Sequence, residues 1–129
     1  MHLSWPSEVR RLPGQRVYAL DLPGHGKSRE SGGQQTIAGY ARLVLHWLDS
    51  LKLHRAVFVG HSMGSAVALA LALHHAERVL GIGLLGSVVR LRVHPDLLAA
   101  ASSPTSFHKA VEALVSSSFS AKTAPHLVE

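Results

Sequence analysis

The sequence contains no cysteine, which excludes a disulfide framework and any metal site built on thiolates. Charged residues are also scarce: they make up 16% of the 129 residues, against 47% hydrophobic residues. This balance is richer in apolar groups than that of an average soluble domain. The chain therefore holds enough apolar material for one hydrophobic core and is too short for two.

Long hydrophobic runs are missing as well. The longest, from Ala66 to Leu73, is far below the roughly 18 residues of a membrane span and is better explained as a buried helix. The first residues show no basic stretch followed by an apolar one, so no signal peptide is visible and we expect a cytoplasmic protein. The formal charge of +5 comes from scattered basic residues without a Lys/Arg-rich run, so we expect no nucleic-acid partner.

The apolar patterns that are present predict an α/β fold. In chain order we expect a strand at 16–20, a turn cluster at 21–26, an amphipathic helix at 34–51 capped by Thr36, a strand at 56–59 ended by Gly60, a helix at 63–75 and a strand at 79–85. Strands and helices that alternate in this way are typical of right-handed crossovers in a parallel sheet.

The composition changes after this alternating region. Serines become frequent, and Pro95, Pro104 and Pro125 separate short helical stretches such as 107–115. We therefore expect a core at 1–90 and an added helical segment at 91–129.

A Gly-x-Ser-x-Gly sequence, Gly60-His61-Ser62-Met63-Gly64, lies between the second expected strand and the Ala-rich helix. This context is typical of a nucleophile elbow, a sharp turn that pushes a serine hydroxyl out of the backbone. The turn brings the residues two before and two after the serine close together, so both must be small. At the start of the helix, the Met63 N–H can donate to a developing oxyanion.

Two motifs resemble those of the α/β-hydrolase superfamily, over roughly residues 5 to 90. Asp-Leu-Pro-Gly-His-Gly-Lys-Ser at 21–28 is similar to the loop after that family's fourth strand, and the sequence at 60–64 is similar to its elbow, where a second Gly often follows but Ser65 stands here. The resemblance implies a partial α/β-hydrolase fold with an incomplete sheet, and a serine hydrolase that acts on esters, lactones or related acyl compounds. It implies Ser62 as nucleophile and the Met63 N–H as oxyanion donor. The motif positions it carries over are Asp21, Gly24, His25, Gly26, Gly60, His61 and Gly64.

Other polar residues have simpler explanations. Asp21 is expected to organise its loop by accepting backbone N–H groups rather than to act as a triad acid. His25 and His61 are expected to orient loops. The adjacent His74 and His75 face different sides of a helix, and no His spacing typical of a metal site occurs, so we expect no metal and no cofactor.

A serine nucleophile needs a histidine base and an acid that orients it, and in this fold both follow the nucleophile, acid first. After Ser62 the acids are Glu77, Asp96 and Glu112, and the later histidines are His94, His108 and His126. Only Asp96 or Glu112, followed by His108 or His126, has the required order, and neither acid follows a strand-like run. The resemblance implies that both partners come from strands beyond residue 129, after an inserted lid whose beginning is 91–129.

The resemblance also implies a third strand and a His-Gly loop before residue 1. We therefore interpret the chain as a central fragment of a hydrolase that lacks the triad His and acid and is inactive alone. The alternative is a non-catalytic remnant or interaction module that needs a partner chain to complete its sheet. The expected ligand is a small acyl compound. Its identity and the oligomeric state stay open, although Ser87 could border the pocket.

Overall fold

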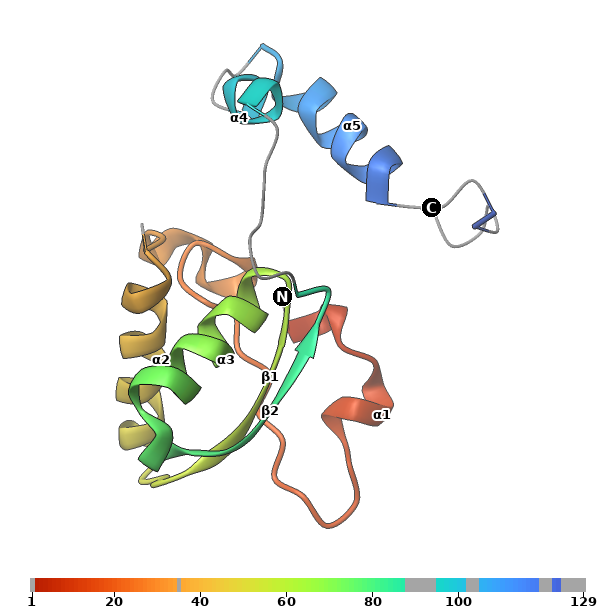
Figure 1. Ribbon diagram of the computed structural model, residues 1–129. Helices are drawn as coiled ribbons and strands as arrows, with labels where there is room; N and C mark the ends of the chain where they lie inside the picture. Colours follow the sequence, from red (N-terminus) through yellow and green to blue (C-terminus); the bar gives the residue numbers. More distant parts are fainter. Residues whose placement is uncertain (1, 35, 88–94, 102–104, 119–121, 124–129) are drawn as a thin grey trace. The chain divides into compact units, whose positions relative to one another are not determined.

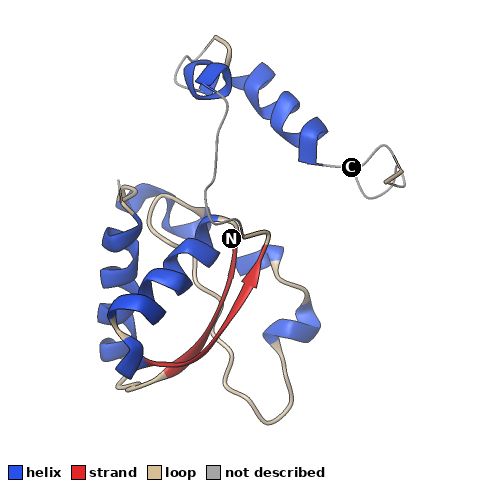
Figure 2. Ribbon diagram, in the orientation of Figure 1, coloured by secondary structure: helices blue, strands red, loops and turns tan. Residues whose placement is uncertain are grey.

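The computed structural model describes residues 2–34, 36–87, 95–101, 105–118 and 122–123 (Figure 1). The chain forms two compact units, Met1–Val88 and Val89–Glu129. The first contains a parallel two-stranded sheet, and Figure 2 shows its strands in red beside helices in blue. The chain is thus an α/β protein with a partial sheet.

Helix α2 (Ile37–Ser50) begins and ends for local reasons. Thr36 is extended, and its hydroxyl accepts the Gly39 N–H at 3.0 Å, which satisfies one of the free donors of the first turn. At the other end Lys52 adopts a left-handed φ of 55°, and the Leu53 N–H donates to the Leu48 carbonyl at 3.0 Å. The predicted cap at Thr36 is confirmed, and the helix is shorter than the expected 34–51.

The sheet pairs β1 (Ala56–His61) with β2 (Val79–Leu85) in parallel. The register places His61 opposite Leu85, so both strands end together at their carboxyl edge. The prediction of a strand at 79–85 is confirmed. The prediction that Gly60 ends the first of these strands is wrong, because β1 continues through His61 and keeps pairing with β2.

The core lies between α2 and α3 (Met63–His74) and the face of the sheet that α3 contacts (Figure 1). Leu48 and Leu71 are fully buried, and removing each such side chain from water is worth about 1.5–3 kcal/mol. α3 is apolar nearly all round because one side faces the sheet and another faces α2. The small side chains of its alanines permit a close approach to the sheet.

The expected strand at 16–20 is absent from the structure, where these residues are irregular. A strand requires a hydrogen-bonded neighbour, and no described residue pairs with this segment. Tyr18 instead places its ring edge-on to Trp47 of α2, with 5.3 Å between ring centroids, and Leu22 packs against the core. The β-branched and aromatic residues at 16–20 therefore reflect side-chain packing and not strand pairing.

Short helices complete the first unit: η1 (His2–Ser4), α1 (Ser7–Arg10), η2 (Gly26–Ser31) and η3 (Ala76–Arg78). The turn cluster expected at 21–26 thus runs directly into a helical turn, η2. No helix within the described ranges is long and apolar enough to cross a bilayer.

The other face of the sheet is apolar and exposed. Because side chains alternate along a strand, every second residue points away from α3. The members of this face, which we call the open sheet face, are Val57, Val59, Leu80, Ile82 and Leu84, and Val57 and Leu80 are 61% and 62% exposed.

The second unit contains α4 (Pro95–Ala101) and α5 (Phe107–Ser118), which pack on each other. The Ser106 hydroxyl donates to the Ala100 carbonyl at 3.0 Å and links the two helices. The helical stretch predicted at 107–115 is confirmed, with an end three residues later. The interpretation of residues 91–129 as the beginning of a lid stays a prediction.

Candidate functional site

Ser62 stands at a sharp corner between β1 and α3. Its backbone has φ 53° and ψ −118°, a region that a residue with a side chain rarely adopts, at a cost of about 1–3 kcal/mol. The residue is exposed, and within the described part of the chain no side chain hydrogen-bonds to its Oγ. The corner therefore presents a hydroxyl to solvent on a strained backbone that its surroundings must hold in place.

Gly60 allows the strand and the helix to meet at this corner. A Cβ at Gly60 would lie 2.1 Å from the Gly64 carbonyl oxygen and 2.5 Å from the Ser65 nitrogen, both backbone atoms. A Cβ at Gly64 would meet no described atom within 4 Å. The expected need for two small residues thus has a steric basis at Gly60, whereas the surroundings described at Gly64 leave space.

The end of β2 fastens the corner. The Ser62 N–H donates to the Leu85 carbonyl at 2.9 Å, which extends the ladder one residue beyond β1. The side chain of His61, which is exposed, lies over Gly86, where a Cβ would come within 3.0 Å of Nε2. Gly86 has a left-handed φ of 55°, so the chain turns beneath this imidazole.

The first turn of α3 supplies donors beside Ser62. Both the Ser65 and Ala66 N–H groups donate to the Ser62 carbonyl, at 2.9 and 3.3 Å. The Met63 N–H precedes them in the turn, where an α-helix offers no internal acceptor. Together with the positive end of the helix dipole, this N–H is suited to an anionic oxygen next to Ser62.

Asp21 lies at the centre of the second motif. Its carboxylate accepts the Lys27 N–H at 3.0 Å and the His2 N–H at 2.5 Å, and His2 Nδ1 lies 2.6 Å from Oδ2. The backbone N–H groups of Lys27 and then His2 hold the pKa of this carboxyl well below its usual range. Gly26 is needed beside it, since a Cβ there would lie 2.5 Å from the carboxyl carbon.

The rest of this motif is organised around the Pro23 carbonyl. Tyr40 of α2 donates its hydroxyl to this oxygen at 3.1 Å, and His25 Nδ1 lies at the same distance, where a protonated nitrogen donates. Gly24 has a φ of 83°, and a Cβ there would lie 3.0 Å from the Gly33 Cα. Asp21 and His25 thus hydrogen-bond to backbone groups of the loop, as expected of residues that organise it.

Of the acids considered for a triad, Glu77 is the one that belongs to the first unit, and the structure places it away from Ser62. Glu77 lies in η3, before β2, with a carboxylate oxygen 4.0 Å from His75 Nδ1. It therefore stands at the amino edge of the sheet, whereas Ser62 stands at the carboxyl edge. Asp96, His108 and Glu112 belong to the second unit, and His94 and His126 lie outside the described residues.

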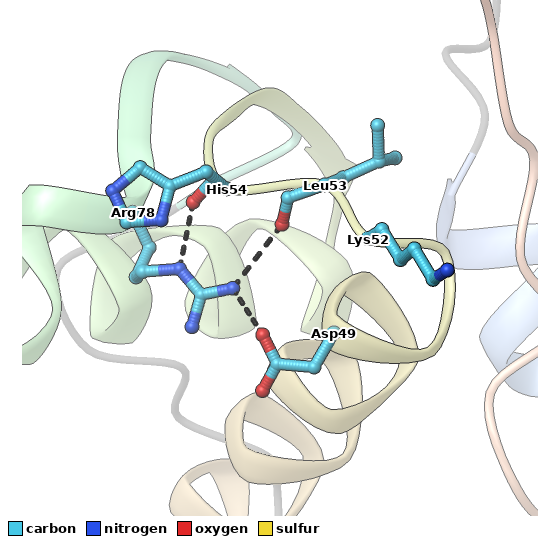
Figure 3. Close-up of a pocket in the computed structure, with 5 residues that line it drawn as sticks. All are labelled: Asp49, Lys52, Leu53, His54 and Arg78. Atoms are coloured by element: carbon cyan, nitrogen blue, oxygen red, sulfur yellow. Dashed lines mark hydrogen bonds and ion pairs between the residues drawn. The ribbon is translucent and has the colours of Figure 1, made fainter.

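A shallow hollow of about 230 Å³ lies at the amino edge of the sheet (Figure 3). Arg78 crosses it: Nε donates to the His54 carbonyl at 2.7 Å, and Nη2 donates to Asp49 Oδ1 at 2.5 Å and to the Leu53 carbonyl at 3.3 Å. These acceptors belong to the end of α2 and the loop before β1. The guanidinium thus joins elements of the fold, and the hollow lies at the opposite strand ends from Ser62.

Three residues with a clear part in these contacts are absent from the sequence-based set. His2 contacts a residue 19 positions away, and Arg78 contacts residues 24 to 29 positions away. No local sequence pattern reveals contacts at such separations. Ser65 could have been given a role, because it is a hydroxyl at the start of an otherwise apolar helix, at the position where the family's elbow often has a second glycine.

Residues 1–124 match the family described as alpha/beta hydrolase fold. Over 72 residues the chain is 43% identical to the dihydrolipoyllysine-residue acetyltransferase component of the acetoin cleaving system of Cupriavidus necator, covering 56% of this chain and 19% of that protein. Over 93 residues it is 34% identical to the pimeloyl-(acyl-carrier protein) methyl ester esterase of Yersinia enterocolitica, covering 71% of this chain and 34% of the esterase.

A solved structure of an N-acyl homoserine lactone degrading enzyme is also similar, with a TM-score of 0.69 and 34% identity. The match covers 84% of this chain and 43% of the enzyme. The chain thus spans a fifth to a third of the length of the two curated relatives and less than half of this structure. With the family matched over 124 of its 129 residues, the chain belongs to the alpha/beta hydrolase fold family.

Proposed function

We propose that Ser62 is the nucleophile of a serine hydrolase that acts on an ester, a lactone or a related acyl compound. The observation that carries this proposal is the backbone of Ser62, whose φ of 53° is maintained at an exposed corner between β1 and α3. A strained, exposed serine at a helix start is the arrangement of a nucleophile elbow, which exposes an attacking hydroxyl.

The reaction would proceed by acyl transfer. Ser62 Oγ forms a bond to the acyl carbon while its proton passes to a base, and the carbonyl oxygen becomes an oxyanion beside the Met63 N–H. Collapse of this intermediate breaks the bond to the leaving alcohol, which takes up a proton. Water then releases the acid by the same two steps. We propose that the base and the acid that orients it come from outside these 129 residues.

The relatives support the choice of substrate class. One is a methyl ester esterase and another is an enzyme that degrades N-acyl homoserine lactones, so an ester and a lactone are both represented among the substrates of similar proteins. The proposal therefore includes both esters and lactones as substrates. We propose a small acyl compound as the substrate. We also propose that the protein acts in the cytoplasm.

A fluorophosphonate probe tests the proposal because it forms a covalent bond with an activated serine. We expect labelling of the 129-residue chain at Ser62, slow alone and faster when imidazole is added as a base. Ser62→Ala should abolish it, whereas Ser50→Ala, at an exposed serine at the end of α2, should not change it. Equal labelling of the Ser62→Ala variant, or none with imidazole present, would contradict the assignment.

The second candidate is a non-catalytic remnant or interaction module whose sheet is completed by a partner chain. The open sheet face favours a partner chain that also covers it, because five apolar side chains on neighbouring strands are exposed together. Its test is sedimentation: a module of this kind should form a defined complex that Leu80→Lys or Val57→Lys disrupts. A monomer that labels at Ser62 favours the hydrolase instead.

A further inference from the structure

The side chain of Ser65, in the first turn of α3, is completely buried, at 0% exposure. Its hydroxyl oxygen lies 2.7 Å from the Gly60 carbonyl oxygen and 2.9 Å from the Leu85 carbonyl oxygen, and it accepts the Leu85 N–H at 3.2 Å. All of these partners are backbone groups, two at the end of β2 and one at the end of β1. A single side chain thus contacts both strands where they end.

The hydroxyl is satisfied both as a donor and as an acceptor at this position. It carries one proton, which it donates to either carbonyl, and its lone pairs accept the Leu85 N–H. A hydroxyl buried in an otherwise apolar helix face is retained at no cost only when it is hydrogen-bonded in this way. Glycine or alanine in its place would leave the helix and the strand ends without this connection.

The Leu85 carbonyl links Ser65 to Ser62. It accepts the Ser62 N–H, which lies 2.9 Å away, and it is one of the two carbonyls within reach of the Ser65 hydroxyl proton. The Gly60 carbonyl, the other acceptor of Ser65, belongs to the residue at which a Cβ would collide with the backbone of the first turn of α3. Any shift of the two strand ends relative to α3 would therefore change the position of the Ser62 backbone.

We propose that Ser65 is a positioning residue for the nucleophile. Its hydroxyl fixes the carboxyl ends of β1 and β2 to α3, and so maintains the bond between Ser62 and Leu85 and the positive φ of Ser62. This inference rests on the proposed function, since it assigns Ser65 a part in keeping Ser62 Oγ and the Met63 N–H in reacting geometry. Ser65 itself does not touch substrate.

The unaltered chain provides the first test. A hydroxyl proton held between buried carbonyls exchanges slowly with water, so we expect a separate proton NMR signal for the Ser65 hydroxyl with contacts to Gly60 or Leu85. A rapidly exchanging hydroxyl at Ser65 would overturn the proposal without any substitution.

Variants provide the second test. In Ser65→Ala we expect the Ser62 amide to exchange about fivefold faster or more relative to the Phe58 amide in the middle of β1, with a changed Ser62 13Cα shift. Labelling of Ser62 by the fluorophosphonate should slow about ten- to hundredfold, because a small misplacement of a reacting group has a large effect on rate. Ser65→Thr, which keeps the hydroxyl, should restore part of both, and Ser50→Ala, which removes an exposed hydroxyl bonded to Trp47, should change neither.

The readouts separate the two proposals. If Ser62 exchange and shift change in Ser65→Ala but neither chain labels, Ser65 positions the corner and the serine-hydrolase proposal fails. If the unaltered chain labels and Ser65→Ala labels at the same rate with an unchanged Ser62 signal, the hydrolase proposal stands and the positioning role is overturned. Equal acceleration at Ser62 and Phe58 would indicate general destabilisation and would also overturn it.

Discussion

The two ends of the parallel sheet are held by different kinds of contact. At the carboxyl edge, the corner at Ser62 depends on backbone against backbone at Gly60 and on the buried hydroxyl of Ser65. At the amino edge, the side chain of Arg78, the last residue of η3 before β2, contacts the loop before β1 and Asp49, whose side chain is 57% exposed. From this comparison we expect the first edge to control the geometry of the corner and the second to contribute to stability alone.

The largest effect is expected at Gly60. Gly60→Ala places a methyl group against the Gly64 carbonyl, and because backbone cannot rotate away, we expect a loss of about 3 kcal/mol or more in the free energy of unfolding. Urea unfolding measures it. Gly64→Ala is the matched control, since its Cβ meets no described atom and alanine favours a helix by up to about 1 kcal/mol. Comparable losses in both variants would contradict the steric account.

An intermediate effect is expected at the amino edge. Arg78→Ala removes the donors to the carbonyls of Leu53 and His54, and we expect a loss of about 1–3 kcal/mol in unfolding free energy. The rate of fluorophosphonate labelling at Ser62 should not change, since the folded corner is separate from these contacts. A slower labelling rate in the folded Arg78→Ala protein would show that the two edges are coupled.

A smaller effect is expected when only the ion pair at this edge is removed. Asp49→Asn takes away the charge that Arg78 contacts and leaves both backbone acceptors in place. Because Asp49 is more than half exposed, the loss should be below about 1 kcal/mol and should shrink further as salt is added. A loss of unfolding free energy as large as that of Arg78→Ala would mean that the ion pair, and not the contacts with the two carbonyls, stabilises the amino edge of the sheet.

The mildest change is expected from acid, and it affects a third region, the Asp21 loop. The pKa of Asp21 is lowered in the folded chain, so its contribution to stability is fully present above its ordinary unfolded pKa, near 4. That contribution is lost as the pH falls through the lowered folded value. Melting temperatures of the unaltered chain and of Asp21→Asn should therefore differ by a constant amount from pH 7 to 5 and converge only in stronger acid. Convergence already at pH 5 to 6 would contradict the lowered pKa.

Patterns with a local cause could be predicted from the sequence. Thr36 caps α2 because its hydroxyl reaches an N–H three residues on, and 79–85 forms a strand with the expected bounds. The corner at Ser62 follows from glycine beside a strand end and a helix start, and the structure gives it a positive φ. The catalytic role of Ser62 is a separate proposal, and the labelling experiment tests it.

Features that depend on a distant partner could not be predicted. Residues 16–20 have the composition of a strand, but a strand exists only where a neighbour accepts its hydrogen bonds. Glycine at position 60 does not end β1, since the ladder to β2 continues through it. The contacts of Arg78 and His2 join segments whose proximity only the folded chain establishes.

The close approach at Gly60 has a consequence for how this chain can change. Where two side chains collide, a second substitution elsewhere can often make room, but here the colliding atoms are a carbonyl and an amide of the first turn of α3. A genetic screen for suppressors of Gly60→Ala should therefore yield true revertants, or replacements that move α3 as a whole, rather than compensating changes among the core residues.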